Sequence, residues 1–136
     1  MQAASFTCDS RTVVLLVEDE PLVRMCAADI FEEEGFEVIE AATAPVALKI
    51  LEKRDDVTAV FTDIDMPGGM NGLELAGIIY ERWPHIALVV TSGVCRVGAD
   101  KLPGDGVFIG KPYAAAAPVR IIRELVRQRS RDENQH

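Results

Sequence analysis

The chain has 136 residues, of which 49% are hydrophobic and 26% charged, and its formal net charge is −8. This composition predicts one globular domain with a core of its own. The acidic surface would repel a phosphate backbone, which argues against nucleic acid as a direct partner. No apolar run approaches the roughly 18 residues that a membrane span requires, and the cysteines lack metal-ligand spacing. We therefore expect a cytoplasmic domain that contacts neither nucleic acid nor membrane.

Apolar, β-prone stretches recur along the chain and alternate with segments of helical pattern. Strands are predicted at residues 12–17, 36–40, 57–62, 86–91 and 107–109. The domain is expected to span residues 12–127. Residues 1–11 are expected to form a flexible leader, and residues 128–136 a polar, frayed tail.

Helices are predicted to start near Pro21, Pro45, Asn71 and Pro118, because proline suits a first helical turn and asparagine caps one. The side chains expected to face the core are Leu22, Met25, Cys26 and Ile30 in the first helix, Val46, Ile50 and Leu51 in the second, Leu73, Ala76, Ile79 and Tyr80 in the third, and Val119, Ile122, Leu125 and Val126 in the last. Residues 96–106 are rich in glycine and proline, so any helix there is expected to be short.

Alternating strands and helices predict an α/β fold, a (βα)5 three-layer sandwich around a five-stranded parallel sheet. Ligands of such sheets bind at the carboxyl ends of the strands. The unusual polar residues of this chain lie at those ends: Glu18 and Asp19 after the first strand, Asp63 after the third, Thr91 and Ser92 at the fourth, and Lys111 after the fifth. We expect these side chains to meet at one rim of the sheet.

The expected chemistry of this rim is phosphoryl transfer. Glu18, Asp19 and Asp63 would repel one another at close range unless a cation lay between them. Mg²⁺ suits such oxygen ligands, and Lys111 supplies a second positive charge. A metal ion and a lysine beside an aspartate can stabilise a phosphoryl group on that aspartate, which is a known nucleophile.

Five short motifs carry a resemblance to a known family. They are Glu18-Asp19, the D-I-D-M-P run from Asp63, Asn71-Gly72-Leu73, Thr91-Ser92-Gly93 and Lys111-Pro112. In this order, and at these strand ends, the sequence resembles the receiver domain of bacterial two-component response regulators, of the stand-alone, single-domain type. The resemblance implies a flavodoxin-like fold with strand order 2-1-3-4-5.

The resemblance also implies a phosphoacceptor and a metal site. Asp63 would accept a phosphoryl group from a sensor histidine kinase or a histidine phosphotransfer protein. Asp19 and Asp63 would bind Mg²⁺ directly, together with the backbone carbonyl of Asp65, and Glu18 would act through water. The protein would be a phosphorelay signalling domain and not an enzyme.

Further residues would bind the phosphoryl group and transmit its presence. Lys111 would pair with the group, and its peptide bond to Pro112 would be cis. Ser92 is the expected switch hydroxyl, with Thr91 as the alternative, and Phe108 is the expected switch aromatic, turning into space that the hydroxyl vacates. The result would be read by an unknown downstream protein, and homodimer formation is left open.

Several alternatives stay open at this point. Asp63-Ile64-Asp65 also matches the D-x-D core of haloacid-dehalogenase-like phosphatases, although that motif normally sits on the first strand. A degenerate receiver that only binds a partner is a third reading, against which the intact acids and Lys111 argue. Asp65 is an added acid that we expect to alter the phosphoryl lifetime. Cys26 and Cys95 are expected to be small apolar fillers.

Overall fold

The structure is a computed structural model that describes residues 12–66, 68–93 and 101–134. The leader predicted at residues 1–11 and the position of Cys95 lie outside these residues. For residues 130–134 only the backbone is considered below.

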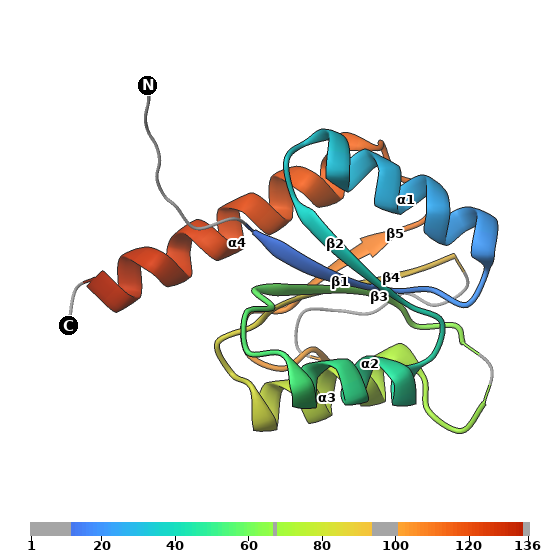
Figure 1. The fold of residues 1–136 in the computed structure, drawn as a ribbon, viewed down its shortest axis with the longest axis horizontal. Coiled ribbons are helices and arrows are strands. Elements are labelled where there is room, and N and C mark those ends of the chain that lie inside the picture. The colour runs from blue at the N-terminus through green and yellow to red at the C-terminus, as the bar shows by residue number, and fades with distance from the viewer. Residues whose placement is uncertain (1–11, 67, 94–100, 135–136) are drawn as a thin grey trace.

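A single parallel sheet forms the centre of the domain (Figure 1). Its strands are β1 (Val13–Val17), β2 (Glu37–Ala41), β3 (Ala59–Asp63), β4 (Ala87–Ser92) and β5 (Val107–Gly110). They lie in the order β2-β1-β3-β4-β5, and every neighbouring pair is parallel. The α/β fold and the strand order expected from the sequence are confirmed, with strand limits that differ by one or two residues.

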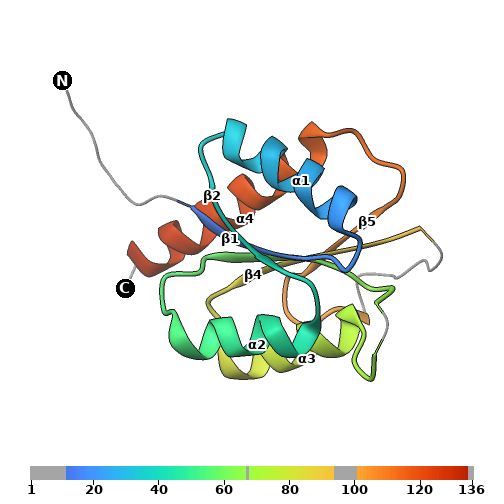
Figure 2. The same cartoon turned by 45° about the vertical axis from the view of Figure 1, so that its right-hand side comes forward.

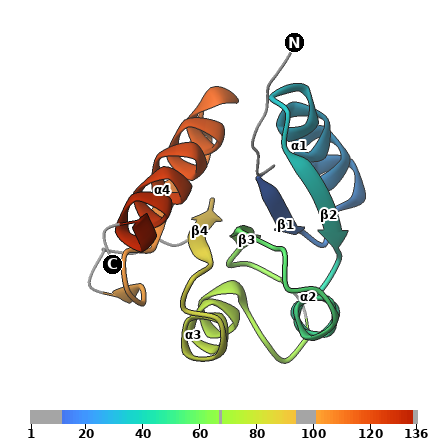
Figure 3. The same cartoon turned by 60° about the vertical axis from the view of Figure 1, so that its left-hand side comes forward.

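Helices cover both faces of this sheet and form the two outer layers of the sandwich. They are α1 (Pro21–Glu33), α2 (Ala44–Lys53), α3 (Gly72–Arg82) and α4 (Ala116–Asn134). Figures 2 and 3 show α1 and α4 on one face and α2 and α3 on the other. In the connection from β4 to β5 the structure describes Gly93 and residues 101–106, and residues 102–105 form bends and turns. The short helix considered for residues 96–106 falls partly on residues 96–100, which lie outside the described chain.

Alternate residues of the central strands enter two separate cores. Leu15 and Val60 pack with α2 and α3, whereas Leu16 and Phe61 pack with α1 and α4. All residues of β1, β3 and β4 are buried. This explains why these strands are continuous apolar runs in the sequence, since a strand covered on both faces has no side for water.

Local capping fixes the helix starts. The side chain of Thr43 accepts a hydrogen bond from the Val46 N–H at the start of α2. At the start of α3, Asn71 Oδ1 accepts from the Glu74 N–H at 2.9 Å while Glu74 Oε1 accepts from the Asn71 N–H at 3.0 Å. This reciprocal pair is a capping box, and it confirms the N-cap predicted at Asn71.

The buried face of α1 differs from the prediction. Ala28 and Phe31 are buried, whereas the side chains of Leu22 and Met25 are 70% and 56% exposed. Both sets have helical spacing, but small alanines let the helix approach the sheet and the Phe31 ring then fills the core. Cys26 is a free, exposed cysteine, so its expected role as a core filler is wrong.

Smaller corrections concern the other helices. Val46 and Tyr80 were expected in the core, yet each is 43% exposed. Ala47 is buried in α2 and Leu75 in α3, beside the correctly predicted Leu51, Ala76 and Ile79. Helix α4 continues to Asn134, past the start of the predicted tail at residue 128. None of the helices in the described chain is long and apolar enough to cross a membrane.

Candidate functional site

Two buried acids meet a lysine at the carboxyl end of the sheet. Strands β1 and β3 are neighbours in a register that pairs Val17 with Thr62, so the residues that follow, Glu18 and Asp63, emerge side by side. Each acid is only 6% exposed. Lys111, which follows β5, places its Nζ 2.8 Å from Asp63 Oδ2 and 3.8 Å from Glu18 Oε1.

Burial sets the electrostatics of this group. Loss of water, together with the charge of Asp63, raises the pKa of Glu18 to about 7, although the Glu20 N–H and Lys111 oppose the shift. Partial burial works against the charge of Lys111, but the hydrogen bond to Asp63 and the charges of both acids outweigh it and raise the lysine pKa. Two buried carboxyl groups thus share one cation, so a further positive charge at this site would be stabilising.

Asp19 is the third carboxylate expected at this site. Asp19 lies at the same end of the sheet but is half-buried. Across the described ranges, no three histidine, cysteine, aspartate or glutamate side chains are grouped so that they could hold a metal ion. The carboxylate site expected from Glu18, Asp19 and Asp63 therefore stays a prediction.

The loop after β3 donates a hydrogen bond to the second carboxylate oxygen of Asp63. Asp63 Oδ1 accepts a hydrogen bond from the Asp65 N–H at 3.0 Å. The Asp65 side chain in turn accepts a hydrogen bond from the Ser92 hydroxyl, with 2.6 Å between Oγ and Oδ2. The sequence drew attention to Asp65 as an added acid and, through its backbone carbonyl, as an expected metal ligand, and nothing in it indicated this side-chain contact.

Gly72 packs closely against the backbone of the same loop. Its N–H donates to the Ile64 carbonyl at 3.1 Å. A Cβ atom on Gly72 would overlap the backbone carbonyl oxygen of Asp63 and lie 2.8 Å from the Ile64 Cα. The sequence placed Gly72 in a motif, but the reason for glycine there is the close approach of the start of α3 to the backbone of the acid.

The two hydroxyls at the end of β4 have different partners. Thr91 is 2% exposed and its Oγ1 donates to the Ile109 carbonyl at 2.6 Å, inside the sheet. Ser92 instead reaches Asp65 above the strand end. Phe108 is half-buried and packs against the core beneath α2 and α3. The Lys111–Pro112 peptide bond is cis, as the resemblance implied.

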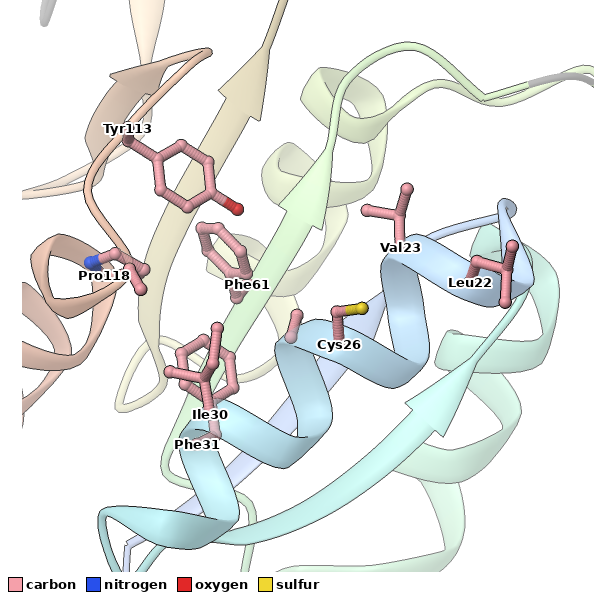
Figure 4. Close-up of a pocket in the computed structure, with 10 residues that line it drawn as sticks. Leu22, Val23, Cys26, Ile30, Phe31, Phe61, Tyr113 and Pro118 are labelled. Carbon is pink, nitrogen blue, oxygen red and sulfur yellow. The ribbon is translucent and has the colours of Figure 1, made fainter.

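An apolar pocket of about 310 Å³ borders this end of the sheet (Figure 4). Its lining includes Leu22, Val23 and Cys26 from α1, Phe61 from β3, and Tyr113 just after the cis bond. The Tyr113 ring stands at 81° to the Phe61 ring, with 6.1 Å between the centroids. The sequence did not indicate this pocket, because the exposed apolar residues of α1 were predicted to face the core.

Comparison with known proteins agrees with this arrangement. The response regulator receiver domain family model matches residues 14–99. The response regulator FleR of Pseudomonas aeruginosa is 31% identical over 80% of this chain and 23% of its own length. The aerobic respiration control protein ArcA of Escherichia coli is 39% identical over 74% of this chain and 42% of its own. This chain thus spans less than half the length of either relative.

Solved structures of similar fold are receivers as well. A CheY-like receiver from Methanospirillum hungatei has a TM-score of 0.81 and 23% identity, covering 90% of this chain and 99% of its own. The receiver of the hybrid histidine kinase CckA has a TM-score of 0.71 and 26% identity, covering 84% and 98%. With the matched family model, the strand order and the paired acids at the strand ends, the chain belongs to the response regulator receiver domain family.

Proposed function

We propose that the protein accepts a phosphoryl group on Asp63 and acts as a switch in phosphorelay signal transduction. The donor would be the phosphohistidine of a sensor histidine kinase or of a histidine phosphotransfer protein. One observation carries the proposal: Asp63 ends a central strand, is 6% exposed, and has Lys111 Nζ at 2.8 Å from one of its oxygens. A cytoplasmic location remains a prediction.

The residues present can support the transfer. An oxygen of Asp63 attacks phosphorus, the P–N bond of the phosphohistidine breaks as the P–O bond forms, and the electron pair returns to the imidazole nitrogen. Lys111 is held charged beside both acids. It can therefore stabilise negative charge on the phosphoryl oxygens during and after transfer.

Mg²⁺ is the proposed cofactor. Asp19 and Asp63, with the backbone carbonyl of Asp65, would hold it directly, and Glu18 through water. The support is electrostatic, because two buried carboxyl groups share one lysine and the pKa of Glu18 is raised to about 7. Oxygen ligands at an open rim are those that Mg²⁺ prefers, and the bound ion would supply positive charge to the phosphoryl oxygens. The response regulator protein TrrA of Thermotoga maritima, 24% identical to this chain, was solved in complex with Mg²⁺-BeF.

Ser92 is the proposed switch hydroxyl. Its Oγ lies at the rim, where Asp65 binds it, whereas the Thr91 hydroxyl is already bonded to the Ile109 carbonyl. A phosphoryl oxygen on Asp63 would take the Ser92 hydroxyl, and Phe108 would turn into the space released. A downstream protein, or a second copy of this chain, would bind in response to this change.

The apolar surface of α1 is the proposed contact for the protein that carries the phosphohistidine. Any such donor must bring phosphorus within bonding reach of Asp63, so it must cover the surface around the rim. Helix α1 starts three residues after Glu18. Leu22, which lines the pocket in Figure 4, is 70% exposed, and Met25 on the same helix is 56% exposed.

Phosphoryl uptake tests the function directly. The protein is incubated with Mg²⁺ and acetyl phosphate or phosphoramidate, and intact mass is measured. We expect a gain of one phosphoryl group that is acid-stable, base-labile and absent in Asp63→Asn. Asp56→Asn, an exposed aspartate at the opposite end of the sheet, is the matched control and should label normally. No uptake from any donor, or normal labelling of Asp63→Asn, would overturn the proposal.

The phosphatase alternative predicts a different result. Its D-x-D acid normally follows the first strand, whereas Asp63 follows β3. It requires repeated turnover of a phosphate ester such as p-nitrophenyl phosphate, with product exceeding the protein concentration. A single phosphoryl group per chain and no accumulation of ester hydrolysis product would support the receiver function instead.

A further inference from the structure

The contact between Asp65 and Ser92 joins the loop after β3 to the end of β4, next to the phosphoacceptor. Ser92 is 2% exposed at the end of β4, and its hydroxyl donates to Asp65 Oδ2 at 2.6 Å. This is the short distance of a hydrogen bond to a charged oxygen, which is stronger than one between neutral groups. The buried hydroxyl is therefore held by an exposed carboxylate from the loop after β3.

The backbone of Asp65 is fixed by the residue that would be phosphorylated. Its N–H donates to Asp63 Oδ1 at 3.0 Å. The next residues are held as well, since the Met66 and Gly72 N–H groups both donate to the Ile64 carbonyl at 3.1 Å. The Asp65 carboxylate is therefore presented to Ser92 by a loop anchored on Asp63 itself.

A serine hydroxyl has one proton to donate. In the described state that proton is directed to Asp65. A phosphoryl group on Asp63 would bring three more acceptor oxygens to the same rim, carrying roughly 1.5 to 2 negative charges in place of the single charge of the carboxylate. It would compete for the Ser92 proton and repel the Asp65 carboxylate at the same time.

We propose that Asp65 is a positioning residue that holds the Ser92 hydroxyl in the unphosphorylated protein and competes with the phosphoryl group for it. This inference rests on the proposed function of Asp63. It gives a direction to the effect of the added acid: Asp65 disfavours the phosphorylated arrangement, and phosphorylation must break the Asp65–Ser92 contact before Ser92 can respond.

The test is a double-mutant cycle read by binding of Mg²⁺-beryllofluoride, a stable mimic of the phosphoryl group. The four proteins are the unmodified chain, Asp65→Ala, Ser92→Ala and the double variant. We expect Asp65→Ala to tighten beryllofluoride binding roughly tenfold when Ser92 is present, because a charge-assisted hydrogen bond no longer competes. In the Ser92→Ala background the same change should tighten binding less than about threefold, since only repulsion is relieved.

An equal gain in affinity in both backgrounds would mean that Asp65 acts only through its charge, which would overturn the proposed competition for the Ser92 hydroxyl. No gain in affinity in either background would overturn it as well. Asp55→Ala, at an exposed aspartate before β3, is the control and should leave affinity unchanged. Absence of binding in all four proteins would overturn the function of Asp63 together with the inference, so the two failures are distinguishable.

A second measurement needs no phosphoryl group. The side-chain rotamer of Ser92 is read from NMR scalar couplings in the free protein. We expect the same dominant rotamer in the unmodified chain and in Asp65→Asn, whose amide oxygen can still accept the hydroxyl, and a lower population of that rotamer in Asp65→Ala. Averaging in the unmodified chain, or an unchanged rotamer population in Asp65→Ala, would show that Asp65 does not hold Ser92.

Discussion

Two clusters with the same charges lie at opposite ends of the sheet. At the amino end, Arg54 Nη2 lies 3.1 Å from Glu37 and 2.7 Å from Asp56. At the carboxyl end, Lys111 lies 2.8 Å from Asp63 and 3.8 Å from Glu18. Each cluster contains one cation and two carboxyl groups. The acids of the first have side chains 40% and 49% exposed, whereas those of the second are 8% and 7% exposed.

The difference in burial shifts the pKa values of acids in the two clusters in opposite directions. At the amino end the hydrogen bond from Arg54 lowers the pKa of Asp56. Water already solvates this acid, so the hydrogen bond adds to the stabilisation of its charged form. At the carboxyl end the loss of water raises the pKa of Glu18 to about 7 despite Lys111 nearby. One cation thus satisfies two exposed acids but not two buried ones, and the buried cluster is the one suited to bind another positive ion.

The largest loss of stability is expected from a substitution at Gly72, whose backbone packs against that of Asp63. Gly72→Ala should lower the free energy of unfolding by about 3 kcal/mol, because its Cβ would overlap the Asp63 carbonyl oxygen and the loop must move. Gly77→Ala is the control: no atom lies within 4 Å of its added Cβ in α3. That change should raise stability by roughly 0.5–1 kcal/mol. Urea unfolding measures both, and equal losses would contradict the clash.

Removal of the cation should distinguish the two clusters. Lys111→Met should cost roughly 2–3 kcal/mol at pH 8 without Mg²⁺, because two buried carboxylates lose their partner. The cost is below that of a fully buried pair, since the lysine side chain is 31% exposed. Arg54→Met should change stability little, because its acids remain solvated. Urea unfolding at fixed pH compares the two, and a larger loss for Arg54→Met would refute the comparison.

The clusters should also respond to pH in opposite directions. The pKa of Glu18 is raised from 4.5 to about 7 on folding, so the folded state binds its proton more tightly. Stability should therefore fall as pH rises from about 4.5 to 7, by roughly 2 kcal/mol without Mg²⁺. Asp56 has a lowered pKa, so its contribution is present above the usual value of 3.8 and is lost only in more acidic solution.

Glu18→Gln checks this pH dependence. The variant should be insensitive to pH between about 4.5 and 7 in thermal or urea unfolding. Asp56→Asn should retain the full dependence in that window, because Asp56 titrates below it. An unchanged pH profile in Glu18→Gln would show that another group is responsible.

Mg²⁺ should stabilise the carboxyl-end cluster alone. At ten times its dissociation constant, the ion should add about 1.4 kcal/mol of stability at pH 8, and chelation with EDTA should remove it. Protonation of Glu18 opposes binding, so the gain should shrink below pH 7. Asp63→Asn should abolish the gain in thermal unfolding, whereas Glu37→Gln should preserve it. A gain that survives in Asp63→Asn would place the ion elsewhere.

The fold and the rim were predictable because their causes are local. Strands buried on both faces must be continuous apolar runs, as β1, β3 and β4 are, and acids placed at the ends of neighbouring parallel strands must meet. The faces of the helices were less predictable. Leu22 and Phe31 are equally apolar, and only packing against the sheet determines that Phe31 is buried.

The remaining contacts of the site depend on three-dimensional distances that the spacing of residues in the sequence does not predict. The Ser92–Asp65 hydrogen bond joins residues 27 positions apart, and the need for glycine at Gly72 comes from a backbone contact. Sequence identified which residues surround Asp63, and three-dimensional packing determined their partners.

The parallel register of β1 and β3 limits how this sequence can change over evolution. Val17 pairs with Thr62, which places Glu18 and Asp63 next to each other on one side of the sheet. Insertion or deletion of a single residue within either strand would turn every following side chain to the opposite face. Length variation should therefore accumulate in the connections at the amino end, while β1 and β3 keep their length even where every apolar side chain in them is exchanged.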